Sequence, residues 1–174
     1  ALAGQALGKL FIHNPEIQFR KKTKAQAIQA LHNAIEVCEE LCDLGDVQSY
    51  GISTWQGLFE EVSLADLVQT TTSSLGPNHR FRNLQLPVSL VRIEEVVKAW
   101  FKNCGPLVEA KERNMMVYAG APLHNGALLN MINAAFIRFF NPSLTAVQVA
   151  INFVRSTRLV NAILVGTSTR DHFD

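Results

Sequence analysis

Residues 10–16, L-F-I-H-N-P-E, form a short apolar run that ends abruptly in polar and titratable side chains. Four later stretches repeat this arrangement, each with polar or small residues at the C-terminal end of an apolar run of strand length. They are Y-G-I-S-T-W at 50–55, N-L-Q-L-P at 83–87, M-V-Y-A-G-A-P-L at 116–123 and A-I-L-V-G-T at 162–167. Sequences with helical periodicity lie between them. This alternation predicts βα units and a parallel sheet.

Apolar periodicity and capping residues predict where the elements lie. We expect strands at 10–13, 47–52, 82–86, 115–119 and 160–165, and helical segments at 24–44, 64–74, 92–113 and 146–157. Ser63 and Thr145 open capping boxes, and Gly45 suits the position just after a helix. Pro106 should break the segment 92–113. Residues 169–174 have the pattern of one more helix, cut off at its start.

The number of strands leaves two architectures open. Five parallel strands can form an open twisted sheet covered by helices, or they can be part of a closed barrel that needs eight strands. In both, chemistry takes place at the C-terminal ends of the strands. Composition and spacing alone do not decide between them.

Composition indicates one globular domain, residues 1–174, because 48% of the residues are hydrophobic and 18% are charged. The net charge of +1 provides no strong field for nucleic acid or an acidic membrane. No apolar run approaches 18 residues, so we expect no membrane span. Residues 1–10 lack an initiator Met and the pattern of a signal peptide, and resemble the middle of a protein. An intracellular protein, cytoplasmic or organellar, is expected.

Three cysteines are too few for a disulfide framework. Cys38 and Cys42 lie four residues apart on the apolar face of the predicted helix 24–44. The other members of that face are Ala27, Ile28, Leu31, Ile35 and Leu41. We therefore interpret both as buried thiols in a reducing compartment rather than as a redox or metal pair. The histidines lack metal-ligand spacing, so no metal site is expected.

In their order, the strand endings resemble those of the aldo-keto reductases, specifically the branch whose catalytic histidine stands in the motif H-N-P-E. The family places that histidine at the end of the fourth barrel strand, here His13. It places G-I/V-S-N/T after the fifth (51–54), a glutamine after the sixth (Gln85), S/A-P-L after the seventh (121–123) and a phosphate loop after the eighth (166–170). The family helix T-x-x-Q-x-A-x-x-F-V-R-S is matched at 145–156. The resemblance covers nearly all of 10–174 and implies strands four to eight of a (β/α)8 barrel.

The resemblance implies hydride transfer between NADP(H) and a small carbonyl compound or alcohol. His13 would donate a hydrogen bond to the carbonyl oxygen or assist proton transfer. Ser53, Thr54 and Gln85 would hold the nicotinamide carboxamide, which needs both donors and acceptors. Ser53 and Gln85 alternatively only satisfy backbone groups of the loops. The remaining cofactor positions implied by the family are Pro122, Leu123, Gly166, Thr167 and Arg170.

Several family features are missing from residues 1–174. The proton-donating tyrosine and its aspartate and lysine helpers belong to strands upstream, and Tyr50 and Tyr118 lie inside strands. Gly120 stands where many members stack an aromatic ring on the nicotinamide. Gly166 stands where a lysine often binds the 2′-phosphate, which Thr167, Arg170 or His172 would partly replace.

Two hypotheses follow. The chain is either a portion of an active NADP-dependent reductase, or a catalytically inactive reductase-like subunit of a larger assembly. In both, we expect missing N-terminal strands or another protein to close the sheet edges, because unpaired edges promote aggregation.

Overall fold

The computed structural model describes residues 5–55 and 57–167, and within them five strands form one sheet. All neighbouring strands are parallel, and their spatial order follows the sequence. The strands are β1 (Leu7–His13), β2 (Val47–Ser53), β3 (Phe81–Pro87), β4 (Met116–Gly120) and β5 (Ala162–Ile163). The predicted α/β class with sequential βα units is therefore confirmed.

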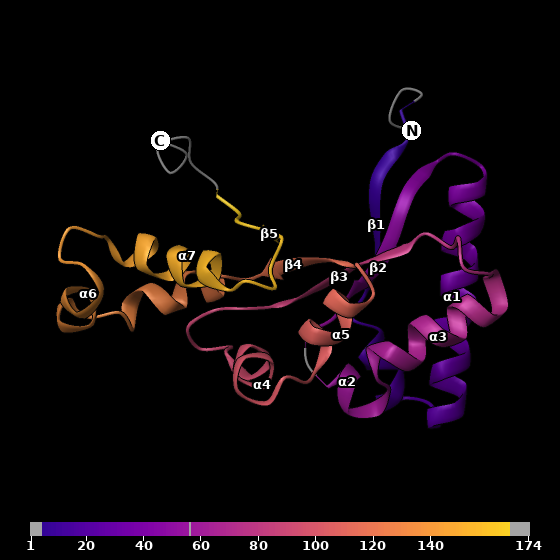
Figure 1. The fold of residues 1–174 in the computed structure, drawn as a ribbon, viewed down its shortest axis with the longest axis horizontal. Coiled ribbons are helices and arrows are strands. Elements are labelled where there is room, and N and C mark those ends of the chain that lie inside the picture. Colours follow the sequence, from indigo (N-terminus) through magenta and orange to yellow (C-terminus); the bar gives the residue numbers. More distant parts are fainter. Residues whose placement is uncertain (1–4, 56, 168–174) are drawn as a thin grey trace.

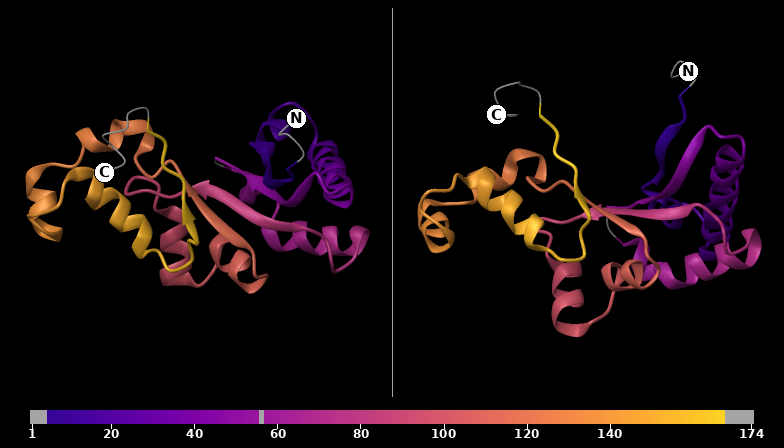
Figure 2. Two further views of the ribbon diagram at one scale, coloured as in Figure 1. Left: turned by 90° about the horizontal axis from the view of Figure 1, so that it is seen from above. Right: turned by 45° about the horizontal axis from the view of Figure 1, so that its top comes forward.

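Most of the helices lie on one side of the sheet (Figure 1, Figure 2). The longer ones are α1 (Lys24–Asp43), α3 (Leu64–Leu75), α4 (Glu94–Lys102), α5 (Pro106–Glu112) and α7 (Ala146–Ser156). One large core joins them to that side of the sheet. It contains, among others, Leu31, Ile35, Tyr50, Ile52, Leu67, Phe81, Leu84, Leu86, Val96, Leu107, Val117 and Val154. Side chains alternate along a strand, so the intervening residues face the opposite side.

The sheet is strongly curved. The rings of Phe11 in β1 and Tyr118 in β4 meet edge to face with their centroids 5.6 Å apart, although β2 and β3 separate these strands. Neighbouring strands lie about 4.8 Å apart, so a flat sheet would hold the two side chains about 14 Å apart. They meet on the side away from the main core, which we call the concave face. Sequential order and this curvature together favour a barrel segment over an open sheet.

Predicted boundaries agree closely with the observed elements over most of the chain. The capping box predicted at Thr145 forms, whereas at Ser63 only the hydroxyl half forms, accepting from the backbone N–H of Asp66. Thr23 forms a capping box that was not predicted. The predicted break in segment 92–113 is also confirmed. There α4 ends at Asn103 in the left-handed conformation, and α5 begins at Pro106.

The last strand is much shorter than predicted. We expected residues 160–165, but β5 contains only Ala162 and Ile163. The backbone N–H of Asn161 donates to Val117 O and that of Leu164 to Ala119 O, both at 2.9 Å. β5 pairs with β4 alone within the part of the chain that is described, so no second neighbour extends its ladder. The helix predicted at 169–174 falls outside the described residues.

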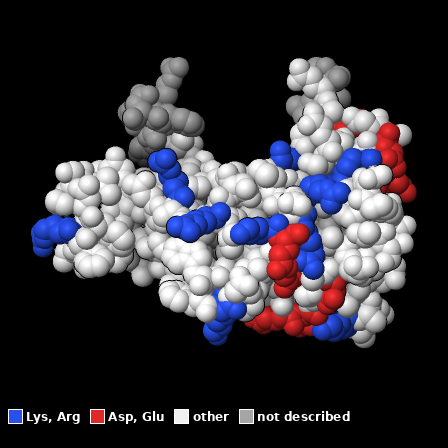
Figure 3. Space-filling model, in the orientation of Figure 1, with Lys and Arg blue, Asp and Glu red and all other residues white. Residues whose placement is uncertain are grey.

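Four short helices were not predicted: η1 (Pro15–Arg20), α2 (Leu58–Glu61), η2 (His124–Asn130) and α6 (Ala134–Phe140). All of them lie in loops that follow the C-terminal ends of strands. Helix α6 buries none of its residues, and its Phe139 is 83% exposed. On the face shown in Figure 3, the end of the molecule that holds α6 and α7 carries few charged side chains. No helix in the described ranges is long and apolar enough to cross a membrane.

The two helical cysteines belong to the core. Cys38 and Cys42 are buried, and burial is the main cause that raises the pKa of each thiol above its usual value. A raised pKa lowers the thiolate fraction and hence reactivity. The prediction of buried core thiols is confirmed.

A buried histidine makes stability depend on pH. His79 is 3% exposed, and its Nε2 lies 3.1 Å from the Thr72 hydroxyl, which already donates to Val68 O. Nε2–H is therefore the donor, and Nδ1 is left buried without a partner among the described residues. Burial lowers the pKa of His79, with Arg82 adding to the effect.

We expect acid to destabilise the fold through His79. Because the pKa is lowered in the folded state, the contribution of neutral His79 is fully present above about pH 6.5, and it is lost as the pH falls through the lower folded pKa. In His79→Gln, the unfolding free energy should decrease less than in the wild type as the pH is lowered below about 6.5, as measured by urea denaturation at several pH values. Thr72→Val removes only the hydrogen-bond partner and should show the same decrease with pH as the wild type. An equal decrease with pH in His79→Gln and the wild type would contradict this assignment.

Candidate functional site

The pairing of the strands places three predicted site residues side by side. His13 pairs with Ser53, Ser53 with Gln85, and Gln85 with Tyr118. Paired residues of parallel strands face the same side of a sheet, so these four form one row across the concave face. The row lies at or near the C-terminal ends of the strands, where barrel enzymes carry their chemistry. Ser53 is buried, Gln85 is half-buried and His13 is exposed.

Gln85 reaches the concave face only because β3 contains an extra residue. Tyr50 pairs with Phe81, but Gly51 pairs with Asn83, so Arg82 has no counterpart in β2. Such a bulge reverses the alternation of side chains. Phe81 and Leu84 are three residues apart, yet both are buried in the main core.

Two neighbours hold β2 and β3 together at this bulge. The Asn83 side-chain amide donates to Ser49 Oγ at 3.0 Å and to Tyr50 O at 3.1 Å. Gly51 lets the strands approach closely, because a Cβ at this position would lie 1.8 Å from the Asn83 carbonyl oxygen. The bulge therefore sets which side chains of β3 join the row.

The loop after β1 is tied to the end of β2 through Glu16. Asn14 takes the left-handed conformation (φ 48°), and its backbone N–H donates to Ser53 O at 2.7 Å. The Glu16 carboxylate is buried and accepts from the Thr54 hydroxyl at 3.0 Å and the Trp55 backbone N–H at 2.8 Å. Glu16 thus fixes the backbone on both sides of the His13–Ser53 pair.

This arrangement separates Ser53 from Thr54. The resemblance implied that both hold a carboxamide, but only Ser53 stands in the row. The Thr54 hydroxyl is directed to Glu16 instead. Sequence reasoning did not single out Glu16; an acidic residue directly after a proline that opens a helix was the available signal.

Removing the Glu16 carboxylate should destabilise the fold. Glu16→Ala leaves the buried Thr54 hydroxyl and the partly buried Trp55 backbone N–H without this acceptor, so we expect a loss of about 2 kcal/mol in unfolding free energy. Chemical denaturation measures it. The exposed Glu40 gives the control, since Glu40→Ala should change stability by less than about 0.5 kcal/mol. If Glu16→Ala and Glu40→Ala both lose less than about 0.5 kcal/mol of unfolding free energy, Glu16 does not stabilise this loop.

The loops after β2, β3 and β4 meet at Trp55. Its ring stacks on His124 with centroids 6.4 Å apart, and the Arg92 guanidinium lies 5.8 Å from its centroid. Ala121, His124 and Asn125 have positive φ (49°, 49° and 55°), a conformation that costs non-glycine residues about 1–2 kcal/mol each. Strain of this kind is often concentrated at functional loops.

The remaining predicted positions lie in the loops after β4 and β5. Pro122 is buried, and Leu123 packs on a small second core with Leu128, Ile132 and Ala150. Gly166 and Thr167 are exposed after β5. Arg170 and His172 lie outside the described residues. Gly120 has no side chain, and the Gln85 Nε2 lies 3.2 Å from where its Cβ would be, so Gln85 occupies part of that space.

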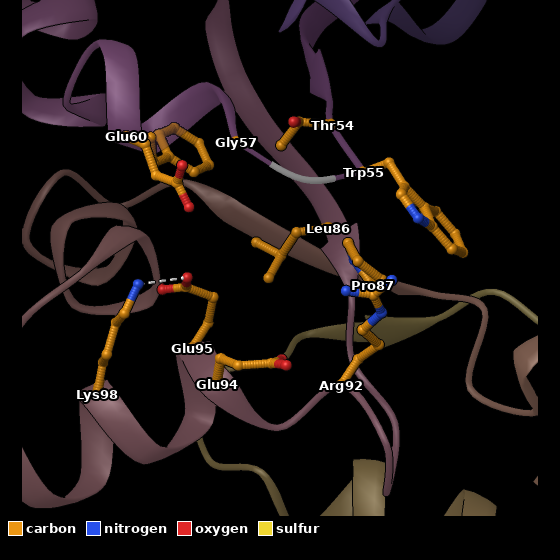
Figure 4. Close-up of a pocket in the computed structure, with 11 residues that line it drawn as sticks. Thr54, Trp55, Gly57, Glu60, Leu86, Pro87, Arg92, Glu94, Glu95 and Lys98 are labelled. Carbon is orange, nitrogen blue, oxygen red and sulfur yellow. Dashed lines mark hydrogen bonds and ion pairs between the residues drawn. The ribbon is translucent and has the colours of Figure 1, made fainter.

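A cavity of about 240 Å³ opens beside this edge but on the helix side of the sheet (Figure 4). Its lining includes Thr54, Leu86, Glu60, Glu95 and Lys98. The Lys98 ammonium donates to Glu95 at 2.8 Å, which raises the pKa of Lys98. None of His13, Ser53 and Gln85 lines this cavity, so the row and the cavity are separate features. In the described part of the chain, no three His, Cys, Asp or Glu side chains could hold a metal ion together.

Comparisons with known proteins agree with this geometry. No family model and no curated protein matches the sequence. Among solved structures, the aldo-keto reductase AKR11C1 from Bacillus halodurans (holo form) matches 97% of this chain and 53% of its own, with a TM-score of 0.59 and 16% identity. The thermostable aldo-keto reductase Tm1743, in complex with the inhibitor epalrestat, matches 97% and 52%, with a TM-score of 0.56 and 16% identity.

The fold is a partial (β/α)8 barrel. At 16% identity these likenesses establish the fold alone, and they confirm the predicted fold class. The chain spans about half the length of the solved structures it matches.

Proposed function

We propose that this chain supplies strands four to eight of an aldo-keto reductase barrel that binds NADP(H) and converts a small carbonyl compound or alcohol. Residues 1–174 would be a single, incomplete barrel domain. The row formed by His13, Ser53 and Gln85 carries the proposal. These residues come from three strand ends of a barrel fold, on the concave face, and the two similar structures named above are aldo-keto reductases.

The residues of the row fit a nicotinamide carboxamide. Ser53 and Gln85 lie on neighbouring strands and offer a hydroxyl and an amide, which together present donors and acceptors. Among the described residues, neither side chain is engaged in a hydrogen bond. Gly120 leaves the space next to Gln85 without a side chain of its own. When bound, the cofactor supplies or accepts the hydride.

His13 lies at the end of β1, next to Ser53 and exposed on the concave side. Its ring N–H would donate a hydrogen bond to the substrate oxygen, where negative charge develops. Asn14 and Glu16 hold the backbone that carries it. Pro122 and Leu123 would border the cofactor, and Gly166, Thr167 and Arg170 would receive its phosphates.

Gln85→Ala tests the cofactor site. We expect NADPH binding, measured by calorimetry or fluorescence titration, to weaken by about 1–3 kcal/mol, because the carboxamide loses its buried partner. The matched control is Gln48→Ala, an exposed glutamine in β2, which should bind as the wild type does. An unchanged NADPH affinity of Gln85→Ala, or no NADPH binding by the wild-type protein, would contradict the proposed cofactor site.

A catalytically inactive reductase-like subunit is the second candidate. One observation favours it: Gly120 offers no ring to stack on a nicotinamide. Absence of turnover in the completed assembly, with NADPH binding retained, would point to this role.

We further propose that three more βα units complete the sheet. Eight strands close a barrel of this type, and five are described here. Within the described residues, β1 and β5 each pair on one side only, which leaves rows of backbone N–H and C=O groups for other strands. The missing N-terminal strands or another protein would supply them.

A further inference from the structure

The concave face carries an unusual charge for the interior of a barrel. Lys9, in β1, lies with its ammonium 5.9 Å from the centroid of the Tyr118 ring. Tyr118 is only 9% exposed and also contacts Phe11, so the three side chains gather over the middle of the sheet. Tyr118 belongs to the row of His13. The ammonium is therefore directed toward the middle of the face rather than out of the N-terminal end.

No carboxylate in the described residues compensates Lys9. It makes no ion pair within them. Its neighbours on the concave face are polar or apolar but uncharged, namely Phe11, Ser49, Gly51, Asn83 and Tyr118. Lys9 is exposed in the open sheet, so water solvates its ammonium, and the lack of a counter-ion costs little free energy.

Closure of the barrel changes this balance. The interior of an eight-stranded barrel is filled with side chains and excludes water. A buried ammonium then needs a hydrogen-bonded counter-ion, since the ring of Tyr118 alone compensates only a small part of lost hydration. The strands that close the barrel must therefore carry the counter-ion for Lys9.

We propose that the concave face docks a stretch of polypeptide outside residues 1–174, made of three parallel βα units, one of which points an Asp or Glu carboxylate at Lys9. This rests on the proposed barrel and deepens it by naming the chemistry of the closing piece. A second copy of this chain does not fit the site. It would bring five strands where three are needed, and its described concave face offers no carboxylate to Lys9.

The test uses the native protein, purified from its source together with whatever it is bound to. A lysine-acetylating reagent should modify Lys9 at least about tenfold more slowly than the exposed Lys102, and denaturation in urea should remove the difference. Carbodiimide, which joins a lysine to a contacting carboxylate, should then link Lys9 to one Asp or Glu. Mass spectrometry should find that residue in a strand outside residues 1–174.

Charge reversal gives the second arm. Lys9→Glu should prevent assembly, seen as loss of the native size on gel filtration, because two carboxylates would face each other. Lys9→Met should weaken assembly less than Lys9→Glu does, because it leaves the carboxylate unpaired but adds no second negative charge. The surface variant Lys102→Glu should keep assembly. Fast acetylation of native Lys9, a link only to another copy of residues 1–174, or normal assembly of Lys9→Glu would each overturn the proposal. None of these measurements depends on NADPH, so the proposed reaction can fail while the closing carboxylate stands.

Discussion

NADPH oxidation by residues 1–174 alone, with a reactive small aldehyde, is expected to stay at the background rate. A positioned general acid contributes about 10²–10⁴ in rate. Of the four-residue catalytic set that the resemblance implies, residues 1–174 contain only one counterpart, His13. Tyr50 is fully buried on the helix side against Phe81, and Tyr118 lies between Phe11 and Lys9 inside a strand. Tyr50 faces away from the row of His13. Tyr118 belongs to that row, but β2 and β3 separate its strand from β1 and its ring packs against Phe11.

The NADPH oxidation assay is informative only if residues 1–174 are folded, because an unfolded chain is inactive whatever its residues. Circular dichroism and gel filtration should accompany the assay, and the open edges predict self-association rather than a clean monomer. Tyr118→Phe should leave the background rate unchanged. A soluble monomer with ordinary reductase turnover, lost in Tyr118→Phe, would show that Tyr118 acts as the acid and that no partner is needed.

His13, Ser53 and Gln85 were predicted from the resemblance of the strand endings to a known family. Their pairing in one row follows from parallel register once the strands are adjacent. Apolar periodicity and capping boxes were sufficient for α1, α3 and α7 because each helix carries its own start signal. The role of each site residue remains a prediction.

Features that depend on distant contacts were not predictable. The unpaired Arg82 is visible in the sequence only as an irregular spacing of Phe81, Leu84 and Leu86, which has several interpretations until β2 is placed beside β3. The Glu16 contact to Thr54 joins residues 38 positions apart. The length of β5 depends on a neighbour, because a strand with one partner lacks half of its ladder.

Gly51→Ala is expected to destabilise the protein by about 3 kcal/mol or more, the upper range for forcing atoms into a packed site. The new methyl group would lie 1.8 Å from the Asn83 carbonyl oxygen and 2.4 Å from the carbonyl carbon. These are backbone atoms, so no rotamer change relieves the overlap. β2 and β3 must separate locally, which weakens the Asn83 bonds to Ser49 and Tyr50.

The control comes from the neighbouring strand. A methyl group added at Gly8 in β1 would have no atom within 4 Å, so Gly8→Ala should be neutral or slightly stabilising through the unfolded state. Asn83→Ala should not rescue Gly51→Ala, because the clash involves the carbonyl oxygen rather than the side chain. Urea denaturation of the single variants and the double variant gives all of these values. A Gly51→Ala protein within about 1 kcal/mol of the wild type would mean that the strands do not approach this closely, and that something other than the bulge turns Gln85 toward Ser53.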